Sequence, residues 1–237
     1  MLNEVNHWIA IIGTAVDALL LCRVLLLRLQ RVYLFITLAC LLGLFFDGVD
    51  LWLENDQNGG LRVFLYSRFL FAFLFPLVVW DVFEEMKSQI SNIRRIAARK
   101  LVSGIFFATV FGFLLSVFAR TADSSGPPIH VTLGLVLWTG SSTASLAFLW
   151  TLRRAIRLQN IGVPSNTAVW LVFWQLFLLV QVLTCFYFLI APSLGNGTAY
   201  VLNIAFNTYG IVITAWCILR LRALPSDVSS APANASL

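Results

Sequence analysis

The stretch VYLFITLACLLGLFFDGVDLWL, residues 32–53, decides the class of fold. It carries only two charged side chains, Asp47 and Asp50. An α-helix needs about 20 apolar residues to cross the hydrocarbon core of a bilayer. The stretch is therefore long enough and apolar enough to be a transmembrane helix, and its two aspartates need a separate explanation.

The composition extends this interpretation to the whole chain. Of the 237 residues, 59% are hydrophobic and 11% are charged, whereas soluble domains average about 25% charged residues. Seven apolar runs of spanning length predict an all-α bundle of seven transmembrane helices over residues 1–223, followed by a disordered polar tail, 224–237. The expected spans are roughly 8–29, 32–53, 62–86, 100–120, 130–152, 168–191 and 199–222.

The basic residues predict the orientation of the bundle. Cytoplasmic loops of membrane proteins are enriched in Lys and Arg. Twelve of the sixteen basic residues fall on one side of the expected spans, and only Arg62 and Arg120 fall on the other. We therefore expect the N-terminus outside and the C-terminus in the cytoplasm, in the inner (plasma) membrane of the cell. Anionic lipid headgroups then explain the net charge of +5 better than nucleic acid does.

The third span is expected to continue as a basic helix past the membrane. In EEMKSQISNIRRIAARK, residues 84–100, apolar side chains recur on one helical face. The basic residues beside this face are Lys87, Arg94, Arg95, Arg99 and Lys100. We expect the helix to lie on anionic lipids at the cytoplasmic surface. The alternative is a docking surface for a membrane or cytoplasmic protein partner.

Charged residues inside the spans are expected to meet one another. A charge in lipid costs about 3 kcal/mol on insertion scales, so it usually has a partner. Counted from the outer ends of their helices, Asp47 and Arg68 both lie ~9 Å deep, and Asp17 lies at ~13 Å. Asp47 and Arg68 sit on spans joined by a short loop and can pair, while Asp50 is close enough to the surface to be solvated.

Other polar side chains fall in the same outer half of the expected bundle. Asn203 and Asn207 are four residues apart in the seventh span, and Gln181 lies in the sixth. Two interpretations stay open: hydrogen bonds between helices, or the lining of an outward-facing polar pocket. The candidate pocket or ion-pair residues are Asp17, Asp47, Asp50, Arg68, Gln181, Asn203 and Asn207.

Two further polar stretches are expected to have structural roles. The run TGSSTAS, residues 139–145, favours close helix packing with local hydrogen bonds. Asp81 and Glu85 lie four residues apart in VVWDVFEEM, residues 78–86, and we expect solvated pairing with nearby arginines.

Signatures of catalysis and of cofactor binding are missing from the sequence. The two histidines, His7 and His130, lie at the outer ends of two spans, which gives no support to a bis-histidine haem. The two lysines, Lys87 and Lys100, lie in the cytoplasmic connection, which excludes a retinal Schiff base in the seventh span. No H-E-x-x-H, G-x-S-x-G or C-x-x-C motif is present. We therefore expect no enzyme, no metal and no other cofactor.

The basic turn in LLLRLQRVYLFITLAC, residues 25–40, separates a leucine-rich helix from an aromatic one. The third span ends in the acidic and aromatic segment VVWDVFEEM. In these features and in its overall layout, the chain resembles a group of bacterial seven-helix membrane proteins to which no activity is assigned. The resemblance implies the fold and no activity.

Three functions fit these features. The favoured hypothesis is a receptor-like or accessory module with an outward-facing polar pocket. A small-solute or proton-coupled transporter is the first alternative, because Asp17 is deep and a repeat of three helices is possible. A structural subunit of a larger membrane complex is the second, because 20 phenylalanines leave ample surface for lipid or a partner.

Overall fold

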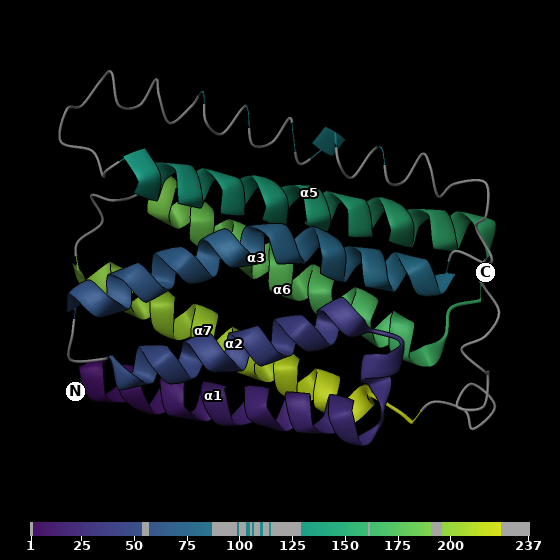
Figure 1. The fold of residues 1–237 in the computed structure, drawn as a ribbon, viewed down its shortest axis with the longest axis horizontal. Helices are drawn as coiled ribbons and strands as arrows, with labels where there is room; N and C mark the ends of the chain where they lie inside the picture. The colour runs from purple at the N-terminus through teal and green to yellow at the C-terminus, as the bar shows by residue number, and fades with distance from the viewer. Residues whose placement is uncertain are drawn as a thin grey trace, which may run out of the picture.

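The chain is described here by a computed structural model that covers residues 2–53, 57–86, 129–160, 162–190 and 196–223, with Arg99, Ser103, Gly104, Phe106, Val110 and Leu114 between them. This part is entirely helical, which confirms the predicted all-α class for these residues (Figure 1). The elements are α1 (Leu2–Leu26), the 3-10 turn η1 (Leu29–Arg31), α2 (Leu34–Trp52), α3 (Gln57–Met86), α5 (Ile129–Gln159), α6 (Ser165–Ile190) and α7 (Asn196–Arg220).

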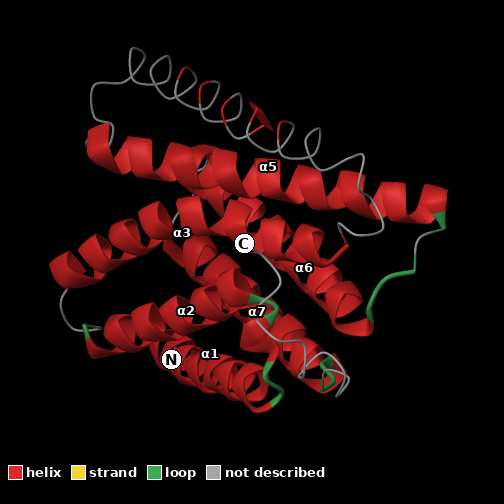
Figure 2. Ribbon diagram, turned by 45° about the vertical axis from the view of Figure 1, so that its right-hand side comes forward, coloured by secondary structure: helices red, strands yellow, loops and turns green. Residues whose placement is uncertain are grey.

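The described long helices form two groups, and the helices of each group lie side by side (Figures 1 and 2). In one group α1 packs against α2 and α7, and in the other α5 packs against α3 and α6. Contacts of α2 with α3 and of α6 with α7 join the groups. The first and last described helices are therefore direct neighbours.

Burial is uneven between the two groups. In the most apolar stretches, 56% of the residues of α5 and 44% of those of α6 are buried, against 17% in α1 and α7 and 11% in α2. The outward faces of α1, α2 and α7 are nevertheless apolar, with Leu19, Phe45 and Leu219 all more than half exposed. Helices that are apolar on both faces are typical of a membrane environment.

Among the described helices, five are long and apolar enough to cross a membrane. These stretches are Glu4–Leu26, Leu34–Trp52, Gly134–Leu158, Ser165–Thr184 and Val201–Arg220. They match five of the seven expected spans and indicate a membrane protein. The third expected span corresponds to α3, a 30-residue helix that is not among the five. The fourth, 100–120, lies largely outside the described residues, as does the tail 224–237.

A proline inside α3 is compensated from α5. Pro76 has no N–H, so the carbonyl of Ala72, four residues earlier, loses its normal helical donor. The hydroxyl of Ser141 donates a hydrogen bond to that carbonyl. Ser141, Ser142 and Ser145 are all buried. The predicted local hydrogen bond in TGSSTAS is made by Thr139, which donates to the carbonyl of Leu135 (2.7 Å), whereas the bond of the buried Ser141 crosses to α3 and replaces the one that the proline removes.

The N-terminus of α2 is capped by a side chain from α3. Helix N-termini leave N–H groups without helical partners, and Tyr33 at the cap position makes no side-chain cap. Oδ2 of Asp81 accepts hydrogen bonds from the N–H groups of Phe35 (2.6 Å) and Ile36 (3.0 Å). Solvated pairing is therefore the wrong interpretation for Asp81, which is 8% exposed. A carboxylate is also favourable against the positive end of a helix dipole.

The C-terminal end of α7 is held by two side chains, in contacts that we call the α7 clasp. Asn166 of α6 donates to the carbonyl of Arg222 (2.8 Å) and accepts from its N–H (2.9 Å). Arg23 of α1 donates to the carbonyl of Leu221 (3.1 Å). The clasp lies at the basic end of the bundle, where α1, α5 and α7 all terminate (Figure 1).

Candidate ligand-binding site

A cavity of about 410 Å³ lies between the two groups of helices. This volume falls within the range of roughly 300–1,000 Å³ that is typical of small-molecule sites. The cavity is lined by residues from α1, α2, α3, α6 and α7. All seven candidate residues, which the sequence spreads over these five helices, line it: Asp17, Asp47, Asp50, Arg68, Gln181, Asn203 and Asn207.

Helical spacing explains how α1 and α7 present their polar residues to the cavity. On α1, Asn6, Gly13 and Asp17 follow one face, because they are separated by seven and four residues. A Cβ atom at Gly13 would lie 3.8 Å from Cγ1 of Ile211, so α1 and α7 approach each other closely there. Nδ2 of Asn203 donates to Oδ1 of Asn6 (3.0 Å). Asn203 therefore links two helices and lines the cavity as well.

Two carboxyl groups meet at the inner part of the cavity. The carboxyl groups of Asp17 and Asp47 lie close enough to interact with each other, and Thr214 of α7 lies beside Asp17. An ionised carboxylate is only an acceptor. A hydrogen bond between two carboxyls therefore requires one proton, which the two groups would share. We call Asp17 and Asp47 the acid pair.

Arg68 is held in place by partners on three helices. Its Cζ atom lies 4.4 Å from the ring centroid of Trp138 in α5. Its Nη1 donates to Oε1 of Gln181 in α6 (3.3 Å), and its charge acts on Asp47 in α2. The expected proximity of Asp47 and Arg68 is thus present, but Trp138 and Gln181 also orient the guanidinium. Nothing in the sequence singles out Trp138, because a buried tryptophan has the same local pattern as a lipid-facing one.

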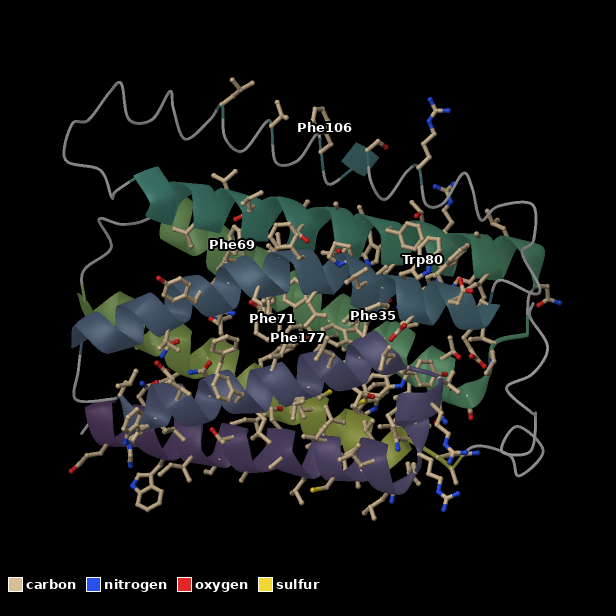
Figure 3. The ribbon with its side chains drawn as sticks, viewed as in Figure 1. Phe35, Phe69, Phe71, Trp80, Phe106 and Phe177 are labelled. Atoms are coloured by element: carbon tan, nitrogen blue, oxygen red, sulfur yellow. The ribbon has the colours of Figure 1, made fainter. Side chains whose placement is uncertain are left out.

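One wall of the cavity is aromatic. The aromatic wall consists of Phe71, Phe75, Phe173, Trp174 and Phe177. Ring centroids are 5.5 Å apart for Phe71 and Phe75, and 5.9 Å apart for Phe173 and Phe177. Phe75 also contacts Phe177 across the two helices (6.1 Å), and Figure 3 shows Phe71 and Phe177 in the middle of the bundle. The spacing of four residues within each pair was the available sequence signal.

The cavity also has threonines in its lining, and the basic stretch after α3 is considered separately from it. Thr184, a polar residue of the sixth expected span, also lines the cavity, and so do Thr14 and Thr214, which the sequence did not single out. Of the basic stretch after α3, Arg99 is exposed. The other four residues of that stretch, Lys87, Arg94, Arg95 and Lys100, lie outside the described residues.

Comparison of the chain with models of protein families, with curated proteins and with solved structures finds no match. The site must therefore be interpreted from its own residues. Within the described ranges, no group of three or more His, Cys, Asp or Glu side chains is arranged to hold a metal ion.

Proposed function

We propose that this protein is a receptor-like membrane module that binds a small solute in the cavity between its helices. The observation that carries the proposal is the convergence of seven polar side chains from five helices on a single space of about 410 Å³. Polar groups are costly inside a membrane, and they commonly mark ligand or ion sites there. Apolar lining with a few converging polar groups is typical of small-molecule sites.

The proposal includes seven spans in the inner membrane, with the cavity opening outward. The basic end of the bundle is taken as cytoplasmic, since Lys and Arg are enriched on that side. Asn6, Asp50 and Asn203 line the cavity near the opposite end of their helices. The basic stretch after α3 would then meet anionic lipids at the cytoplasmic surface or bind a protein partner there.

A thermal-shift screen tests the proposed function. The purified full-length protein is melted in detergent with a library of small polar solutes. We expect at least one solute to raise the melting temperature, and the rise to be lost in Asp47→Asn. Thr151→Val serves as the control, because Thr151 donates to its own helix (Phe148 carbonyl, 2.8 Å) and does not line the cavity. If no solute in the library raises the melting temperature of the wild type or of Thr151→Val, the proposal is overturned.

A proton-coupled transporter is the second candidate, and the acid pair supports it. A pair of carboxyls on neighbouring helices, α1 and α2, that can share a proton is a suitable element for coupling. Transport would require the α7 clasp to open, because the clasp ties α7 to α1 and α6. Solute uptake into proteoliposomes that is driven by a proton gradient and abolished in Asp17→Asn would favour this candidate. Uptake that ignores the gradient would count against it.

A further inference from the structure

We infer that the solute bound in this cavity is a compact organic cation, an ammonium group carried on an apolar or aromatic body. The inference rests on the proposed function and adds the chemical class of the ligand. It follows from the combination of three carboxyl groups, one restrained guanidinium and an aromatic wall in the same cavity.

The charges around the cavity favour a cation. Asp17, Asp47 and Asp50 line it, whereas Arg68 is the one basic side chain among the described lining residues. The flat face of the Arg68 guanidinium lies over the ring of Trp138, and one of its N–H groups donates to Gln181. An anionic ligand would have to approach three carboxyl groups to reach this one guanidinium. A cation meets complementary charge instead.

The acid pair offers the hydrogen-bond acceptors that an ammonium needs. An ammonium group is a donor only, and Asp17, Asp47 and the Thr214 hydroxyl supply acceptor oxygens close together. The ammonium can take the place of the proton shared by Asp17 and Asp47, so that both carboxyls become ionised and the proton leaves to solvent. Binding is therefore expected to release about one proton per ligand.

The aromatic wall selects an organic cation over a metal ion. Hard metal ions such as Ca²⁺ take about six to eight oxygen ligands, and the described residues contain no cluster arranged to hold a metal. Aromatic faces attract organic ammonium groups through the ring quadrupole and also cover apolar surface. Phe75, Trp174 and Phe177 lie within 6.2 Å of one another, centroid to centroid, and form a continuous surface for the ligand body.

The experiment compares three probes that share one body and differ in charge. Full-length protein in nanodiscs is titrated calorimetrically with 2-phenylethylamine, 2-phenylethanol and 3-phenylpropionate. We expect the amine to bind roughly tenfold more tightly than the alcohol, and the carboxylate to bind least. Titrations of the amine in two buffers of different ionisation enthalpy should report the release of about one proton.

Isosteric variants separate the two halves of the proposed site. Asp47→Asn keeps the shape of the side chain and should remove the preference for amine over alcohol. Phe177→Leu should weaken amine and alcohol alike, because it alters only the aromatic wall. Circular dichroism confirms that each variant is folded before titration.

The outcomes distinguish this inference from the proposed function. Equal binding of amine and alcohol, tighter binding of the carboxylate, or unchanged amine binding in Asp47→Asn would overturn the cation inference and leave solute binding intact. Failure of all three probes, together with a solute library that stabilises nothing, would overturn both.

Discussion

Replacing Ser141 with alanine isolates one hydrogen bond that crosses between two helices. The Ser141 hydroxyl donates to the carbonyl of Ala72, which Pro76 deprives of its helical donor. Both Ser141 and Ala72 are buried, so water cannot replace the lost donor. The Ser141→Ala variant therefore leaves a buried carbonyl without a partner.

The expected cost follows from that geometry. An unsatisfied buried polar group costs about 1–3 kcal/mol. For chains of this size, each kcal/mol lowers the melting temperature by about 2–4 °C. We therefore expect Ser141→Ala to melt roughly 2–12 °C below the wild type. Ser142→Ala is the matched control, because the buried Ser142 hydroxyl makes no hydrogen bond among the described residues, and it should melt within about 1 °C of the wild type.

A double-mutant cycle makes the explanation specific to the proline. Pro76→Ala restores an N–H that can donate to Ala72, so it should recover most of the stability lost in Ser141→Ala. Contacting residues commonly show coupling energies of about 0.5–3 kcal/mol, and we expect at least about 1 kcal/mol here. Thermal melts followed by tryptophan fluorescence measure all four proteins. Additive effects of the two substitutions would refute the reasoning.

Three further substitutions test other contacts by the same melts. Asp81→Ala removes the acceptor of two N–H groups at the start of α2 and should cost about 2–3 kcal/mol; an unchanged melting temperature would contradict the cap. Arg68→Lys keeps the charge but not the planar group over Trp138, and should cost about 1 kcal/mol; a wild-type melt would exclude this stacking contribution. Asn166→Ala opens the α7 clasp and should accelerate proteolysis just after α7, whereas an unchanged cleavage rate would show that the clasp is dispensable.

Much of the fold was predictable because spanning helices are encoded locally. A run such as residues 32–53 needs no distant partner to be recognised as apolar and helical, and α2 lies within it. The contacts between helices were harder to predict. Asp81 looked like an interfacial carboxylate because its hydrogen-bond donors belong to another helix. One of them, the N–H of Ile36, is 45 residues away in the sequence. The donor role of Ser141 likewise depends on a proline in a different helix.

The polar part of the site was predictable for a physical reason that does not apply to the aromatic part. A carboxylate or amide in an apolar run is costly in lipid, so each one points to a shared polar space. Asp17, Asp47 and Asn207 are three such residues, and the structure places them around one cavity. Phe75 and Phe177 carry no such penalty in lipid. Their place in the cavity wall follows from helix packing alone.

The pairing of α1 with α7 has a consequence for how the protein is made. Among the described helices, α1 leaves the ribosome first and α7 last, yet α7 is the most extensive neighbour of α1. Asp17 is therefore synthesised well before Thr214, its neighbour on α7. During this interval its partner must come from α2, which follows α1 directly and carries Asp47. The Asp17 carboxyl can therefore pack against Asp47 of α2 first, and docking of α7 then adds Thr214 and completes the assembly.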